Sequence, residues 1–213
     1  MTSPAQQRYE AEVRRQWAAD PADGAHDIGH LRRVWANART IAAQEHGADL
    51  EVLLAAAIFH DLVNLPKSSP DRARASTLSA ERAAIFLRAD GMDENHIMAV
   101  SHAIAAHSFS ARIAPETLEA KILQDADRLE ALGAIGIARM FHVAGTTGQL
   151  LFDADDPMAL DRPLDDRRFA LDHMTTKLLG LPSTMQTAFG RTMAETRADW
   201  LMSFRTRLLA EIG

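Results

Sequence analysis

The hydrophobic residues of this chain recur with the period of an α-helix over much of its length. Across residues 28–45 they follow the i, i+3, i+4 spacing that predicts an amphipathic helix. The positions that form this stripe are Leu31, Val34, Trp35, Ala38, Ile41 and Ala42. Residues 50–62, LEVLLAAAIFHDL, are apolar nearly all round with an alanine-rich middle, which favours a helix over a strand. This segment is predicted to be a central, buried helix.

Other segments extend the same pattern. Further helices are predicted over residues 10–19, 75–89, 94–106, 118–140, 165–179 and 183–209. Asp93 precedes one of them as an N-cap, and residues 145–163 are acidic and irregular. No alternating strand pattern and no internal repeat is present. The prediction is an all-α fold, a compact helical bundle of residues 1–145 with a helical extension of residues 146–213 on the same single domain.

The amino-acid composition excludes several classes of protein and of functional site. The 213 residues contain no cysteine, which excludes disulfide scaffolds, thiolate metal sites and cysteine nucleophiles. Lys and Arg number 23 against 29 Asp and Glu, and the net charge of −6 gives no reason to expect duplex nucleic acid as a partner. The first residues lack the apolar core of a signal peptide, and no run approaches the length of a membrane span. A cytoplasmic protein without membrane contact is therefore expected.

Ionisable residues within apolar helices are the most informative feature. His60 and Asp61 end the most apolar helix, His30 opens another, and Asp127 interrupts the apolar segment KILQDADRLEALGAIGIARMF. Charged side chains are rarely buried unless they are paired, so this pattern calls for a compensating charge. Two imidazoles and two carboxylates form a ligand set suited to Mn²⁺, Fe²⁺, Co²⁺, Ni²⁺ or Zn²⁺, and less well to Mg²⁺. Because adjacent helical residues point about 100° apart, His60 and Asp61 can share one ion only near a helix end.

The order of these residues resembles a known signature. His30, the dipeptide at 60–61 and Asp127 match the H…HD…D pattern of the HD-domain superfamily of metal-dependent phosphohydrolases. The segments HDIGHLRRVWANAR, LLAAAIFHDLVNLPK, AVSHAIAAHSFS and KILQDADRLEALGAIGIARMF resemble bacterial YedJ-type HD hydrolases, as does RPLDDRRFALDHMTTKLLGLPSTMQTAFGR. The similarity extends over roughly residues 25–205.

This resemblance implies one divalent ion at the centre of the bundle, held by His30, His60, Asp61 and Asp127, with Asp61 also taking part in catalysis. It implies hydrolysis of a phosphate ester or phosphoanhydride in a small phosphorylated substrate, expected to be a nucleotide. A bound cation can activate water and polarise a phosphoryl oxygen. HD enzymes that remove pyrophosphate from stringent-response nucleotides carry an acidic pair where this chain has Asn64 and Leu65, so that activity is not expected.

Two more histidines are candidates for catalysis. His102 and His107 lie five residues apart, which separates them by about 140° around a regular helix. In related HD enzymes, histidines after the HD pair act as acid catalysts, phosphate contacts or ligands of a second metal. His102 and His107 are therefore both candidate catalytic residues. The alternative interpretation is that each is a core histidine bonded to a backbone carbonyl.

Phosphate recognition needs cations. Lys67 lies in a Pro- and Ser-containing segment shortly after the HD pair, and Arg33 and Arg128 lie close in sequence to His30 and Asp127. These three are the candidate substrate-binding residues, with solvated surface charges as the alternative interpretation.

Two other functions stay open at this point. One is a di-iron HD-type oxygenase, in which His102 and His107 would hold a second metal, although their angular separation argues against it. The other is a non-catalytic regulatory module that binds nucleotides. The pattern does not distinguish a monomer from a homodimer.

Overall fold

The computed structural model describes residues 2–18, 27–65 and 71–213, and these residues form two compact units, 1–127 and 128–213. Within the described ranges, regular structure is helical apart from one isolated parallel bridge between Leu150 and Phe169. The all-α prediction is confirmed. The expected division at residue 145 stays a prediction. In the described part of the chain, no helix is long and apolar enough to cross a membrane.

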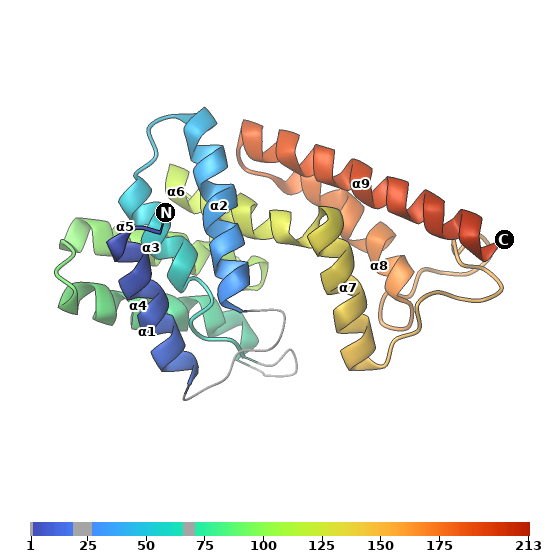
Figure 1. Ribbon diagram of the computed structural model, residues 1–213, viewed down its shortest axis with the longest axis horizontal. Coiled ribbons are helices and arrows are strands. Elements are labelled where there is room, and N and C mark those ends of the chain that lie inside the picture. The colour runs from blue at the N-terminus through green and yellow to red at the C-terminus, as the bar shows by residue number, and fades with distance from the viewer. Residues whose placement is uncertain (1, 19–26, 66–70) are drawn as a thin grey trace. The chain divides into compact units, whose positions relative to one another are not determined.

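The first unit contains the helices around the candidate site. They are α1 (Pro4–Trp17), α2 (Ile28–Glu45), α3 (Leu50–Phe59), α4 (Ala75–Ala89), α5 (Glu94–His107) and α6 (Leu118–Arg128), with short 3₁₀ turns η1 (Arg72–Arg74) and η2 (Phe109–Ala111). Helix α3 packs against α1, α2 and α5, and α4 lies beside α5 (Figure 1). Every residue of α3 from Val52 to Phe59 is buried, which confirms the prediction of a central helix. Burial of this apolar surface is the main stabilising contribution to the unit.

Capping side chains fix where these helices begin. Asp27 accepts a hydrogen bond from the backbone N–H of His30, and Asp93 accepts from the second and third residues of α5. Ser3 caps α1, whose first residue is Pro4, so that helix begins six residues before the predicted start at Glu10. The predicted bounds of α2 and α4 are confirmed.

The second unit contains η3 (Leu129–Ala131), α7 (Gly133–Thr147), α8 (Ala170–Thr176), η4 (Leu178–Thr184) and α9 (Ala188–Ile212). The predicted helix over 118–140 was wrong as a continuous element, because Leu132 is extended and Gly133 adopts a φ of +67°. A side chain at Gly136 would approach the Ala131 carbonyl oxygen to 2.2 Å, so the close packing of η3 on α7 requires glycine there.

The predicted helix over 165–179 was also wrong in extent, since α8 begins only at Ala170. The buried carboxylate of Asp172 accepts two hydrogen bonds from the Arg162 guanidinium and one from the backbone N–H of Asp165. These bonds hold residues 162–165 in an irregular conformation. The predicted helix over 183–209 corresponds to α9, which begins five residues later.

Candidate metal centre

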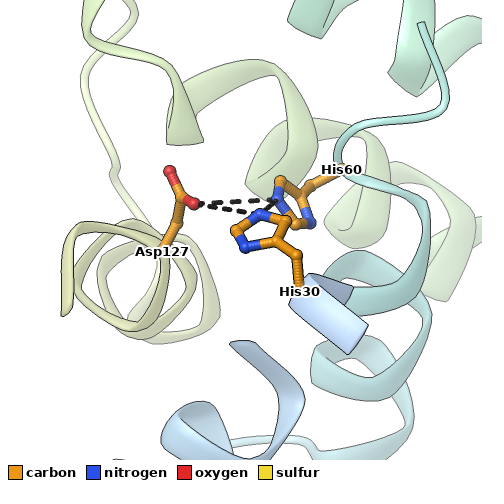
Figure 2. A group of neighbouring side chains, drawn as sticks. All are labelled: His30, His60 and Asp127. Atoms are coloured by element: carbon orange, nitrogen blue, oxygen red, sulfur yellow. Dashed lines mark hydrogen bonds and ion pairs between the residues drawn. The ribbon is translucent and has the colours of Figure 1, made fainter. Parts of the chain in front are cut away.

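Helix ends of the first unit bring the predicted ligands together. His60 follows the last residue of α3, His107 is the last residue of α5, and Asp127 lies one residue before the end of α6. His30 lies in the first turn of α2. The C-terminal ends of three helices therefore meet at one point, where their partial negative charges favour a cation. Figure 2 shows His30, His60 and Asp127 facing one another.

The distances between the donor atoms suit one ion. Nε2 of His30 lies 3.2 Å from Nε2 of His60, 3.6 Å from Oδ2 of Asp61 and 3.5 Å from Oδ1 of Asp127. Nε2 of His60 lies 3.5 Å from Oδ2 of Asp61 and 3.8 Å from Oδ1 of Asp127. Ligand atoms about 2.1 Å from a tetrahedral ion are separated by about 3.4 Å. The donor atoms of His30, His60 and Asp127 form one group that could hold a divalent ion, and Oδ2 of Asp61 lies 3.6 Å and 3.5 Å from the two imidazole nitrogens of that group.

Hydrogen bonding fixes the form of the His60 ring. Its Nδ1 lies 2.9 Å from the Ala57 carbonyl oxygen and must donate a proton to it, which leaves the Nε2 lone pair facing the cluster. Burial lowers the pKa of His60 to about 4, so the ring is neutral near pH 7 and is ready to act as a ligand. Desolvation alone would raise the pKa of Asp127, yet the surrounding imidazoles of His60, His30 and His107 hold it below its ordinary value.

The cluster is open to solvent on its carboxylate side. The side chains of His30 and His60 are 1% and 0% exposed, whereas those of Asp61 and Asp127 are 20% and 31% exposed. A water molecule or a substrate would therefore reach the centre past the two carboxylates. Because α3 ends at Phe59, His60 and Asp61 follow directly after the helix, and Nε2 of His60 lies 3.5 Å from Oδ2 of Asp61, as expected for a shared ion near a helix end.

His107 joins this cluster from α5. Its ring meets that of His60 edge-to-face with a centroid distance of 4.9 Å, and its Nε2 lies 3.7 Å from Oδ1 of Asp61. Nδ1 of His107 donates to the Ile104 carbonyl oxygen at 2.6 Å, so Nε2 is the nitrogen that faces the centre. The two oxygens of Asp61 thus point to different partners, Oδ2 to His30 and His60 and Oδ1 to His107.

The other predicted site residues lie elsewhere or are engaged differently. Nε2 of His102 accepts a hydrogen bond from the backbone N–H of Glu116 at 3.0 Å, and the structure does not bring this ring into the cluster. Arg33 folds back along α2, with its Nη1 3.2 Å from the position that a Cβ atom on Gly29 would take. Arg128 donates to the Thr184 carbonyl oxygen at 2.5 Å. Lys67 lies outside the described residues.

Buried amides and hydroxyls around the cluster were missed by sequence reasoning. Asn37 on α2 donates to the carbonyl oxygen of Ala126, directly before Asp127, at 3.2 Å. Ser79 on α4 accepts from the backbone N–H of Val63, two residues after Asp61, at 3.0 Å. Both are polar residues on amphipathic helices, and nothing in the pattern separates them from surface positions.

Comparison with known proteins places this arrangement in a family. Residues 27–132 match the HD domain family. Over 211 residues the chain is 33% identical to the uncharacterized protein YpgQ of Bacillus subtilis, covering 95% of this chain and 94% of that protein.

Solved structures agree with this match. The fold resembles that of an HD-superfamily hydrolase from Bacillus thuringiensis with a TM-score of 0.76 and 29% identity, covering 99% of this chain and 98% of the other. It also resembles Bacillus subtilis YpgQ in complex with ADP, with a TM-score of 0.74 and 31% identity, covering 99% and 97%. The similarity includes both units of the chain.

Proposed function

The chain belongs to the HD-domain family, and from that premise we propose that it is a metal-dependent phosphohydrolase that cleaves phosphate ester or phosphoanhydride bonds of nucleotides. The observation that carries the proposal is the set of four donors, His30, His60, Asp61 and Asp127, in which the two Nε2 atoms lie 3.2 Å apart and 3.5–3.8 Å from the carboxylate oxygens. The nucleotide part draws on the ADP bound by YpgQ, a relative similar along nearly the whole chain.

The chemistry divides between the ion and the side chains. A divalent ion bound there would lower the pKa of a coordinated water and polarise a phosphoryl oxygen. His107 directs Nε2 toward the centre, because its Nδ1 donates to the Ile104 carbonyl oxygen. In the doubly protonated imidazolium form, Nε2 would give a proton to the leaving oxygen while Nδ1 keeps its own proton. Asp61 would hold the ion through Oδ2, which faces His60, while its Oδ1 faces Nε2 of His107. Arg33, one turn along α2 from His30, is a candidate contact for the phosphate.

A single ion agrees better with this geometry than a di-iron centre. The two groups of donors, His30 with His60 and Asp127, and His60 with Asp61 and His107, share the His60 ring. His60 has one free lone pair, at Nε2, because its Nδ1 donates to Ala57. One lone pair serves one ion, and His102, the other ligand that a second iron would use, is bonded to the Glu116 backbone.

Metal analysis and a hydrolysis screen test the proposal. The purified chain is expected to bind about one divalent ion and to hydrolyse members of a nucleotide panel with Mn²⁺, Co²⁺, Ni²⁺ or Mg²⁺. His60→Ala and Asp61→Ala should abolish both properties, whereas His142→Ala, which changes an exposed histidine of α7, should retain them. Undiminished metal content in folded His60→Ala would reject the ligand assignment. Metal binding without hydrolysis of any substrate would favour a regulatory module.

A further inference from the structure

The C-terminal end of α5 is capped in an unusual way. Its last carbonyl groups have no partner within the helix and need other donors. No glycine provides them, because Ser108 leaves the helix in an extended conformation with φ of −80° and ψ of 128°. Instead, three successive carbonyl oxygens each accept a side-chain hydrogen bond. They belong to Ile104, Ala105 and Ala106.

The donors to these carbonyls come from three different helices. His107 itself bonds to Ile104, Ser76 of α4 donates from Oγ to Ala105 at 3.0 Å, and Gln124 of α6 donates from Nε2 to Ala106 at 2.9 Å. Ser76 is 3% exposed and Gln124 is 4% exposed. The helix end that presents His107 is therefore fixed between α4 and α6 by buried polar contacts.

Stability alone does not account for Gln124. Among the residues that the structure describes, its buried Oε1 has no hydrogen-bond partner. A buried acceptor without a partner destabilises the folded chain, whereas an apolar side chain of the same shape would avoid this cost. The amide at this position is better explained by the hydrogen bond from its Nε2 to the carbonyl oxygen of Ala106, the residue directly before His107.

We propose that Gln124 and Ser76 are positioning residues that hold the His107 imidazole at the metal centre. This inference rests on the proposed function, in which His107 gives a proton to the leaving oxygen. Without the two caps, the last turn of α5 loses its fixed end, and Nε2 of His107 moves from its place 3.7 Å from Oδ1 of Asp61. A displacement of 1 Å in a catalytic group lowers a rate by roughly 100-fold.

The test compares Gln124→Met, Ser76→Ala and the double variant with wild type. Leu123→Met is the matched control, because it changes a fully buried neighbour on α6 without removing a cap. Ser76→Thr keeps the hydroxyl and should restore the wild-type behaviour. We expect kcat to fall about tenfold in each single variant and further in the double variant, with metal affinity unchanged within about twofold.

A second readout does not depend on activity. In metal-free protein labelled with ¹⁵N-histidine, wild type should show His107 as one tautomer with the proton on Nδ1. The double variant should show mixed tautomers for His107 and unchanged signals for His60, whose Nδ1 bond to Ala57 is separate.

Unchanged His107 signals in the double variant would overturn the inference, as would a loss of metal affinity that parallels the loss of kcat. Failure of the proposed function has a different signature: wild type binds no metal, or His107→Ala retains full activity. In that case the ring signals still decide whether Gln124 and Ser76 position His107.

Discussion

Replacing Asp127 with Asn separates a metal ligand from a structural carboxylate. Asn keeps the size of the side chain and one acceptor oxygen, so a hydrogen-bonded structural role would largely survive. Oδ1 of Asp127 lies 3.5 Å from Nε2 of His30 and 3.8 Å from Nε2 of His60, a position from which it would contact the shared ion. The substitution leaves this position occupied and removes only the negative charge.

The expected effect follows from the charge balance. A divalent ion beside Asp61 and Asp127 is neutralised, whereas beside Asp61 alone it retains one positive charge in a site whose imidazoles are buried. Changes to groups that only support a ligand weaken metal binding by 10–100-fold. Loss of a ligand charge should reach at least the upper end, about 100-fold, which corresponds to about 2.8 kcal/mol of binding free energy.

Calorimetric titration of the metal-free protein measures this change, with thermal unfolding measured in parallel. Asp155→Asn removes the same charge from an exposed side chain and serves as the control. Activity of Asp127→Asn should fall with affinity and recover in part at high metal concentration. Wild-type affinity combined with a lowered melting temperature would refute the reasoning and assign Asp127 a structural role.

Three further predictions concern Asn37, Lys67 and His96. Asn37→Leu should weaken metal binding about tenfold by freeing the carbonyl before Asp127, and equal affinity by calorimetry would contradict this. Lys67→Ala should raise KM across a nucleotide panel without changing metal content, a prediction from sequence alone. Hydrogen bonds to Asp93 and Asp49 raise the pKa of His96 above its ordinary value of about 6.5. The contribution of these bonds to the free energy of unfolding is therefore complete below pH 6.5 and is lost as pH rises through the raised pKa. His96→Gln should remove this dependence in urea unfolding between pH 6 and 9, and an unaltered slope would rule it out.

The helices of the first unit were predictable because local signals agree with the packing. Asp27 caps α2 and the apolar stripe of that helix faces the core, so its bounds follow from the sequence. Around Gly133 the local signals conflict, since the apolar period continues through a position where the chain turns. That break depends on the contact between Ala131 and Gly136, which the sequence does not specify.

The candidate ligands were predictable for a related reason, because an ionisable residue in an apolar helix stands out against its neighbours. His60 and Asp127 interrupt apolar segments and therefore attract attention, whereas Ser76, Asn37 and Gln124 are ordinary polar residues between apolar ones. Whether such a residue faces solvent or a helix end depends on which element packs opposite. The three are 3%, 7% and 4% exposed, and they bond to carbonyls of Ala105, Ala126 and Ala106 at the ends of α5 and α6.

A cation site at converging helix ends requires buried hydrogen-bond donors around it. Each end supplies partial negative charge that favours the ion, but each also leaves carbonyl groups that must be satisfied away from water. His60 and His107 satisfy one carbonyl each through Nδ1 and keep Nε2 for the centre. The carbonyls of Ala105, Ala106 and Ala126, close to site residues, accept hydrogen bonds from side chains of neighbouring helices. The same helix ends that favour the cation therefore also require the buried polar groups that support the ligands. For this reason, substitutions at the supporting amides and hydroxyls should change function before they change the fold.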